Sequence, residues 1–453
     1  MTDPRSLPRI PTAGVVKAVL VLCWSRLGSL NALVMTRGAK FWKTWPGTFL
    51  CSADSVARIV SGMEAGTLRQ GIHHVYERLK RNKALVGFQG LGVAVLDGHE
   101  TSASYRRRCT GCSRRVLSNG QVQFYHRNVT LMLLSQDLPG RPAVRLLLDV
   151  EPQRAGEGES AAALRLLKRV LADYPRAFDV LLADAYYAMA PFLNLLHAHG
   201  KDAVVVLKNE ERDSYQDAAG LWKMLPPQSG SYKNRLCRWW DTPDICTWPG
   251  VHGALRVVRS EEHWTETRQS TKEIAPQTAN WVWLTTFPTS QMHTAQVVRL
   301  AHLRWDIENH GFNELVNGWH ADHVYRHLPH AIECFLLLFF LAYNLFHAFF
   351  ALNLKPALRR GRTMIFLINL ITTDLHQFPK HSPLSVPPLT PPTARNASHL
   401  RPLPQESGGV DHAPGIQQKE STEDPSEPKN HHPKLIPARK ASQQPQNQSP
   451  STP

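Results

Sequence analysis

Residues 91–100 read LGVAVLDGHE, a short apolar run that ends in an aspartate and a glycine. The run is rich in β-forming residues and Asp97-Gly98 is a turn signal, so we expect a strand that ends at Asp97. Two similar stretches follow, QVQFYHRNVTLMLLS at 121–135 and AVRLLLDV at 143–150. Three strands in succession predict an antiparallel meander.

Helical and strand-like segments alternate after this meander. The expected elements are a helix at 160–174, a strand at 178–183, a helix at 190–199 and a strand at 203–207. The order β-β-β-α-β-α-β is that of the ribonuclease H-like fold, in which the first and fourth strands lie side by side in the middle of the sheet. Asp97 and Asp184 stand at the ends of those two strands. We therefore expect an α/β protein with a ribonuclease H-like core in which these carboxylates are neighbours.

The composition changes along the chain and predicts five parts. Residues 208–295 hold seven of the twelve tryptophans, and residues 379–453 hold 16 of the 33 prolines and no aromatic residue. A Pro-rich segment of that kind cannot bury enough apolar surface to fold. The expected parts are a helical N-terminal domain with possible DNA contact (1–85), the first part of the core (86–207), a β-rich insertion (208–295), the C-terminal helices of the core (296–377) and a disordered tail (378–453).

The charge of the chain points to a polyanionic partner. The formal net charge is +15, and residues 379–453 contribute eight Lys and Arg against six Asp and Glu, so +13 belongs to residues 1–378. DNA or RNA is the first expectation for such a body. Four cations at the end of a predicted helix are candidates for phosphate contacts, although they equally suit a solvated helix end: Arg78, Lys80, Arg81 and Lys83.

Two apolar segments resemble membrane-directed sequences. Residues 14–22 mimic a signal peptide, but Lys17 interrupts the run and no cleavage site follows, so an amphipathic helix is expected. Residues 332–352 are long enough to span a bilayer but include Glu333, Asn344 and His347. We expect a buried core helix and no membrane partner. Seven cysteines, an odd and sparse set, favour a reducing, cytoplasmic compartment.

A third carboxylate would complete a metal site with Asp97 and Asp184. Glu308 lies on a helix expected at 296–316, and Arg304 is four residues before it on the same face. Carboxylate oxygens suit Mg²⁺ or Mn²⁺, and two such ions can support an in-line phosphodiester displacement. Singly, the two aspartates could form a turn and a helix cap, and Arg304 with Glu308 a surface ion pair.

Three segments carry a family resemblance: LGVAVLDGHE at 91–100, FDVLLADAYYA at 178–188 and HLRWDIENHGFNEL at 302–315. They resemble the acidic blocks of DDE insertion-sequence transposases of the insertion-sequence-four family, which carry a β insertion before the glutamate and a Y-(2)-R-(3)-E-(6)-K signature. The resemblance implies Asp97, Asp184 and Glu308 as catalytic acids and ligands of two metal ions, with Arg304 as the signature arginine.

The same resemblance implies an activity and its partners. They are metal-dependent cleavage at the terminal inverted repeats of a transposon, strand transfer into target DNA, and assembly as a homodimer on double-stranded DNA at a prokaryotic nucleoid. Ala301 and Leu315 replace the Tyr and Lys of the signature. Either another residue substitutes, with His302, His310 and Asn313 as candidates, or the copy has decayed.

The alternatives to a transposase are an inactive or domesticated DNA-binding derivative and a ribonuclease H-like nuclease without strand transfer. Neither a phosphate-binding glycine loop nor a nucleophile elbow is present in the sequence, which disfavours nucleotide hydrolysis and acyl transfer. The departures at Ala301 and Leu315 favour the inactive derivative, whereas the large insertion disfavours the simple nuclease.

Other residues are candidates for DNA or metal contact. Trp281 and Trp283 point to one face of a strand, as base-stacking or core residues, and the run Arg106, Arg107 and Arg108 can contact phosphate. The spacing of Cys109 and Cys112 within this basic segment is that of half a zinc knuckle. His126 is a possible further ligand, and a reduced turn without metal is the alternative.

Overall fold

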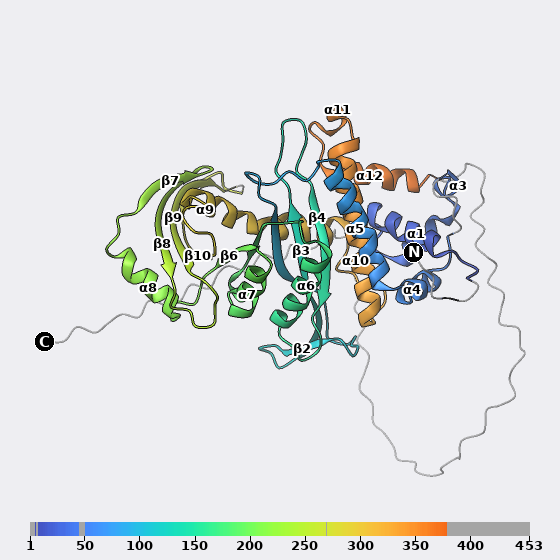
Figure 1. The fold of residues 1–453 in the computed structure, drawn as a ribbon. Helices are drawn as coiled ribbons and strands as arrows, with labels where there is room; N and C mark the ends of the chain where they lie inside the picture. Colours follow the sequence, from blue (N-terminus) through green and yellow to red (C-terminus); the bar gives the residue numbers. More distant parts are fainter. Residues whose placement is uncertain (1–4, 6–7, 45–49, 269, 378–453) are drawn as a thin grey trace, which may run out of the picture. The chain divides into compact units, whose positions relative to one another are not determined.

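The strands predicted around Asp97 lie in a ten-stranded mixed sheet with the order β2-β3-β1-β5-β6-β10-β9-β8-β7, and β4 pairs with β3 (Figure 1). This computed structural model describes residue 5 and residues 8–44, 50–268 and 270–377, so the predicted disordered tail at 378–453 lies outside the described residues. The strands are β1 (Val93–Ser104), β2 (Ser113–Val116), β3 (Val122–Leu134), β4 (Arg145–Pro152), β5 (Val180–Ala183), β6 (Asp202–Val206), β7 (Gln228–Tyr232), β8 (Arg235–Ile245), β9 (Leu255–Thr267) and β10 (Ile274–Thr285).

The predicted neighbourhood of the first and fourth core strands is confirmed. β1 pairs with β5 in parallel, and the register sets Leu96 opposite Ala183. On its other side β1 pairs with β3 in antiparallel fashion, as the predicted meander requires. Asp97 and Asp184 each follow one of the paired residues, so the register brings their backbones next to each other.

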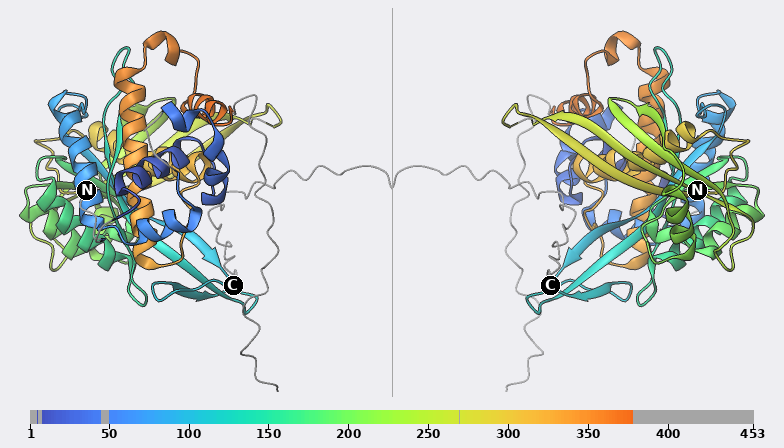
Figure 2. Two further views of the ribbon diagram at one scale, coloured as in Figure 1. Left: turned by 90° about the vertical axis from the view of Figure 1, so that its right-hand side faces the viewer. Right: turned by 90° about the vertical axis from the view of Figure 1, so that its left-hand side faces the viewer.

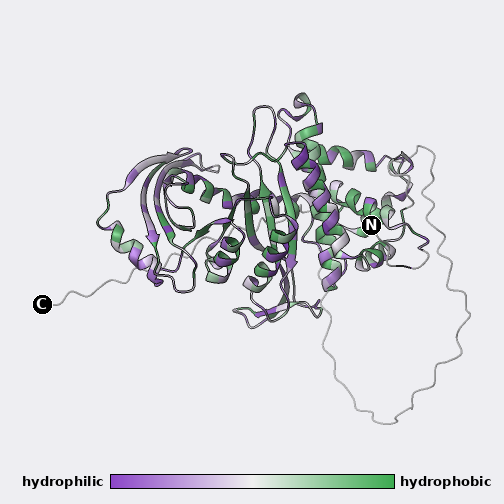
Figure 3. Ribbon diagram, in the orientation of Figure 1, coloured by the Kyte–Doolittle hydropathy of each residue, from purple (hydrophilic) through white to green (hydrophobic). Residues whose placement is uncertain are grey.

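The strand before Asp97 separates two apolar layers because alternate side chains point to opposite faces. Val93 and Val95 belong to the core shared with the N-terminal helices and α10 (Pro329–Ala348), whereas Ala94 and Leu96 belong to the core under α6 (Glu159–Asp173) and α7 (Ala190–Ala198). Burial on both faces explains why this strand reads as a continuous apolar run, and Figure 3 shows the hydrophobic colouring of the central strands and α10.

The strands of residues 208–295 continue the central sheet. β10 pairs with β6 through Trp283 to Thr285, and β9, β8 and β7 follow in antiparallel order. The sequence predicted the β content but not this continuity, and it missed the helix α8 (Asp213–Trp222). The apolar end of β10 pairs with the edge of β6, and this pairing joins the inserted strands to the central sheet. Leu284, which lies at this pairing, is fully buried.

The N-terminal region is helical, as its pattern predicted. Its helices are α1 (Thr12–Trp24), α2 (Leu30–Met35), the 3-10 turn η1 (Thr36–Gly38), α3 (Phe41–Thr44), α4 (Ala53–Ser61) and α5 (Ala65–Arg81). They share a core with α10; α5 runs alongside α10 in Figures 1 and 2, and α1 contacts α10 as well. Beyond α10 and its last turn η6 (Phe349–Asn353) lie α11 (Pro356–Arg359) and α12 (Met364–Leu375).

Helix α10 is buried, as the polar residues in its sequence predicted. Within the described residues Pro329–Asn353 is the one helical segment long and apolar enough to cross a membrane, and 72% of its apolar window is covered by the rest of the fold. Glu333 forms an ion pair with Arg69, in which Oε1 of Glu333 lies 2.6 Å from Nη2 of Arg69. Asn344 accepts a hydrogen bond from the backbone N–H of Leu147 and donates one to its carbonyl, each at 2.8 Å. These contacts hold α10 against α5 and β4.

The helix expected at 296–316 is present but irregular. It begins as α9 (Thr294–His302), tightens into a 3-10 turn η3 (Leu303–Trp305) and then widens into two π-helical turns, η4 (Ile307–Phe312) and η5 (Glu314–Gly318). The π turns keep Ile307, Phe312 and Leu315 buried although their spacing departs from that of an α-helix. Wide turns of this kind often occur at functional sites.

Candidate active site

Asp97 lies within β1 on the face that α9 and its irregular extension cover. Its Oδ1 accepts a hydrogen bond from the N–H of Gly98 at 2.8 Å, and the side chain is 15% exposed. β1 continues to Ser104, so Asp97 does not end the strand as the sequence predicted. The pairing with β3 carries on through Asp97 and Gly98, opposite Thr130 and Val129, and this explains the longer strand.

Asp184 follows β5 directly and caps a short 3-10 turn, η2 (Ala185–Tyr187). Its Oδ1 accepts a hydrogen bond from the N–H of Tyr186 at 2.9 Å. The capping role considered from the sequence is therefore real. It does not remove Asp184 from the site, because the charge of Asp184 acts on Asp97.

Arg304 joins Asp97 to the third carboxylate, Glu308. Its Nη1 lies 3.3 Å from Oδ2 of Asp97 and 2.9 Å from Oε1 of Glu308, and its guanidinium lies over the ring of Trp305, 3.9 Å from the centroid. The Arg304 side chain is 7% exposed and Glu308 is 40% exposed. The pair is thus not a free surface ion pair, because Arg304 is buried and also binds the strand residue Asp97.

The electrostatics of Asp97 are those of a crowded acidic site. Burial raises the pKa of Asp97, Arg304 opposes the rise, and the nearby carboxylates of Asp184 and Glu308 add to it, so that the pKa stands at about 7. Asp97, with two other carboxylates acting on it and only one arginine to oppose them, lacks compensating positive charge. An all-oxygen donor set with this deficit fits a hard divalent cation such as Mg²⁺ or Mn²⁺.

A fourth carboxylate lies behind this group. Glu159, at the start of α6, is 8% exposed and accepts a hydrogen bond from the hydroxyl of Tyr187 at 2.5 Å. It also pairs with Arg127 at 2.8 Å. A side chain at Gly98 would collide with the Glu159 carboxyl group. Its partners hold it against β1 at Gly98, the residue after Asp97.

His99 connects β1 to the helix that carries Glu308. Its ring stacks on Phe312 with the centroids 4.5 Å apart, and burial lowers its pKa. The Nε2 atom of His99 is buried and has no hydrogen-bond partner. The stacking fixes the π-helical turn η4 against β1, and hence the distance between the acids on these two elements.

The residues at the two departing signature positions are part of the core. Ala301 and Leu315 are each 4% exposed. Of the three substitutes considered, His302 is buried and bonded to Oε1 of Glu262 at 2.7 Å, whereas His310 is partly exposed and Asn313 is exposed. Only the latter two present side chains to the surface beside Glu308.

The candidate DNA-contact residues differ in exposure. The rings of Trp281 and Trp283 stack with centroids 5.9 Å apart, so they do share one face of β10. Trp283 is 2% exposed and packs on His302, which is the core arrangement considered from the sequence, while Trp281 is partly exposed and meets Trp305 edge to face. The run Arg106 to Arg108 is exposed in the turn between β1 and β2.

Comparison of the chain with known protein families finds a match that includes part of this site. Residues 141–345 match the family model of the transposase DDE domain, a family of catalytic, DNA-binding nucleases that generally use divalent metal ions. The matched part contains Asp184, Arg304 and Glu308, and Asp97 lies before it. No curated protein matches the chain.

Proposed function

We propose that this protein is a DNA transposase of the insertion-sequence-four type, with Asp97, Asp184 and Glu308 as its catalytic acids on a ribonuclease H-like core. The observation that carries the proposal is that Arg304 joins Asp97 to Glu308 while the pairing of β1 with β5 sets Asp184 next to Asp97, because this links two parallel strands to a helix that begins more than 100 residues later. The match of residues 141–345 to the transposase DDE domain supports it independently.

Asp97, Asp184 and Glu308 would hold two Mg²⁺ or Mn²⁺ ions. When bound, such ions stabilise the attacking and leaving oxygens of an in-line phosphodiester displacement. The chain's own contribution is to fix the carboxylates: the N–H groups of Gly98 and Tyr186 orient Asp97 and Asp184, and Arg304 orients Glu308. Arg304 is buried against three of its neighbours, which favours this positioning role over a direct phosphate contact.

The proposed substrates are the element's terminal inverted repeats and target DNA, bound by a homodimer in the cytoplasm. The charge of +13 on residues 1–378 supports a nucleic-acid partner. Arg106, Arg107 and Arg108, and the exposed cations at the end of α5, are the proposed phosphate contacts, and Trp281 is the better placed tryptophan for base stacking. We propose the same division of the chain into five parts, with boundaries after residues 85, 207, 295 and 377.

Cleavage of a DNA fragment bearing the element's own ends tests the proposal. With Mg²⁺ we expect nicking at the ends and joining of the freed 3′-hydroxyl to a second DNA. Asp97→Ala and Asp184→Ala should abolish both products, and Asp54→Ala, at an acid that is 81% exposed on α4, is the matched control. Cleavage that persists in the two active-site variants would exclude this site.

The second candidate function is a DNA-binding derivative without the chemistry. The core positions of Ala301 and Leu315 favour it, because neither side chain can contact DNA as the signature residues do. End-specific binding by the wild-type chain with no cleavage under any divalent metal would support this derivative against the enzyme.

A further inference from the structure

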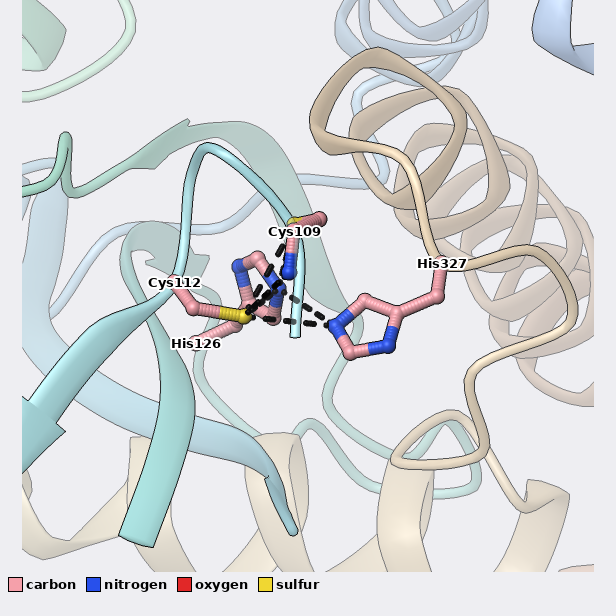
Figure 4. A group of neighbouring side chains, drawn as sticks. All are labelled: Cys109, Cys112, His126 and His327. Atoms are coloured by element: carbon pink, nitrogen blue, oxygen red, sulfur yellow. Dashed lines mark hydrogen bonds between the residues drawn. The ribbon is translucent and has the colours of Figure 1, made fainter. Parts of the chain in front are cut away.

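Four metal-ligand side chains converge at a place distant in the sequence from the three acids. Cys109 and Cys112 lie in the turn before β2, His126 is on β3, and His327 lies in the segment before α10 (Figure 4). His126 is buried and the other three are half-buried. The sequence suggested the first three as possible ligands, but His327 is 201 residues beyond His126 and carried no local signal.

Five of the six distances between the ligand atoms are close to the edges of a tetrahedron around one metal ion, and all four atoms lie within 4.8 Å of one another. Sγ of Cys109 and Sγ of Cys112 are 3.7 Å apart, and Nε2 of His126 lies 3.3 Å and 3.2 Å from them. Nε2 of His327 is 3.3 Å from Sγ of Cys112 and 3.1 Å from Nε2 of His126. With Zn–S near 2.3 Å and Zn–N near 2.0–2.1 Å, tetrahedral zinc separates two sulfurs by about 3.8 Å, sulfur from nitrogen by about 3.6 Å and two nitrogens by about 3.3–3.4 Å.

The backbone around Cys109 supports the same reading. The N–H of Cys109 donates to Sγ of Cys112 at 3.2 Å, which directs a positive dipole at a sulfur, and the N–H of Cys112 returns to the carbonyl of Cys109. A side chain at Gly111 would lie 2.7 Å from Pro329, so only glycine lets this turn approach the start of α10. The turn is thus built to bring both sulfurs to His327.

We infer that Cys109, Cys112, His126 and His327 form a structural Zn²⁺ site. Two thiolates and two imidazoles are the donor set of closed, four-coordinate zinc sites, whereas the three acids offer only oxygen. An open cavity of about 570 Å³ reaches the cluster beside Arg107 and gives the ion a path of entry.

The site has a defined purpose in the fold. It ties the turn between β1 and β2 to the segment between Glu308 and α10, two parts that sequence-local contacts do not hold together. The exposed Arg106, Arg107 and Arg108 directly precede Cys109, so the ion would also fix how they are presented. This positioning of basic residues is independent of cleavage at the three acids.

Metal content and cobalt spectroscopy of the full-length chain test the inference. We expect one zinc per chain in purified protein, and replacement by Co²⁺ should give intense visible bands of tetrahedral geometry with a thiolate charge-transfer band. Asp97→Ala with Glu308→Gln should keep the bound zinc and the cobalt spectrum, since an all-oxygen site cannot give a thiolate charge-transfer band. Absence of the tetrahedral thiolate spectrum in the wild-type chain, or a Cys109–Cys112 disulfide in freshly purified protein, overturns the site.

Substitutions assign the ligands. Cys109→Ser with Cys112→Ser, and separately His327→Ala, should lose the stoichiometric zinc, and Cys246→Ser, at an exposed cysteine outside the cluster, should retain it. Full zinc retention by the double cysteine variant would refute the assignment. If a variant does not fold, alkylation of the wild-type chain decides: two of its seven cysteines should become reactive on chelation, and they should be Cys109 and Cys112. Reactivity of both before chelation contradicts the site.

Discussion

At the scale of single residues, Arg304 explains how an acidic group survives inside the fold. One nitrogen serves Asp97 on a strand and Glu308 on a helix, and the face of the guanidinium rests on Trp305. A planar arginine can use its edge and its face at once, which a lysine cannot do. The arrangement compensates part of the repulsion among the three carboxylates and leaves the rest for a divalent cation.

Glu308→Gln should abolish cleavage while leaving binding to end DNA almost unchanged. The substitution keeps the shape and hydrogen-bonding capacity of the side chain but removes a charge that divalent cations require. Cleavage assays and binding titrations on the same DNA check this, with Glu314→Gln on the next turn as the control for helix disruption. Wild-type cleavage by Glu308→Gln would mean that another residue is the third acid.

Arg304→Ala should reduce cleavage only partway and leave the salt dependence of end binding unchanged, because Arg304 is committed to Asp97 and Glu308. Raising the Mg²⁺ concentration should recover part of the activity. Binding measured over a range of salt is the decisive readout: a slope of log K against log salt that falls by about one unit would instead assign a phosphate contact to Arg304.

The raised pKa of Asp97 predicts a pH-dependent stability difference. Between its ordinary value of 3.8 and about 7, the folded chain retains a proton that the unfolded chain has released, so this group's contribution to stability falls as pH rises through that window. In buffer without divalent metal, Asp97→Asn should therefore raise the melting temperature by a few degrees at pH 8 and by little at pH 4. Asp54→Asn is the control, and a difference independent of pH would contradict the shift.

At the scale of elements, α10 acts as the cover of an exposed strand edge. Among the described residues β4 pairs with β3 alone, and the backbone of Leu147 on its open side is bonded to Asn344 of α10. Arg69 of α5 adds ion pairs to Asp149 of β4 and Glu333 of α10. The polar residues within the apolar helix α10 thus lie where it contacts the edge strand β4 and its neighbour α5.

Asn344→Leu should lower the free energy of unfolding by about 2–4 kcal/mol, because it leaves the N–H and the carbonyl of Leu147 buried without partners. Chemical denaturation measures this loss. Asn353→Leu, at an exposed position beyond the same helix, should have little effect. A loss equally large in the control would mean that general helix or surface effects dominate.

Elements were predictable where their periodicity is local. The strand before Asp97, the helix after the meander and the helical N-terminal region follow from apolar spacing, and the parallel pairing of β1 with β5 followed from element order. The π-helical turns at Glu308 could not be predicted in this way, because η4 packs on β1 and β4, and no local pattern encodes that packing. Glu159 and His327 escaped for the same reason, since their partners lie far away in the chain.

At the scale of the whole molecule, the folded body and the tail should behave independently. Residues 379–453 lack aromatic side chains and hold 16 prolines. Removal of 378–453 should therefore leave the melting temperature and metal-dependent cleavage nearly unchanged. Differential scanning calorimetry of the full and shortened chains checks this, and a large fall in melting temperature would show that the tail packs on the body.

Helix α10 also constrains how this chain can be synthesised. Its partners α1, α4 and α5 occupy the first 81 residues, yet α10 itself ends at Ala348. On a translating ribosome the early helices emerge before α10 does. Their apolar faces, which α10 covers in the folded protein, therefore stay exposed until most of the polypeptide has been synthesised. The nascent chain therefore passes through a long interval in which it is a substrate for chaperones and proteases, and the fold is complete only once nearly all of its core has been made.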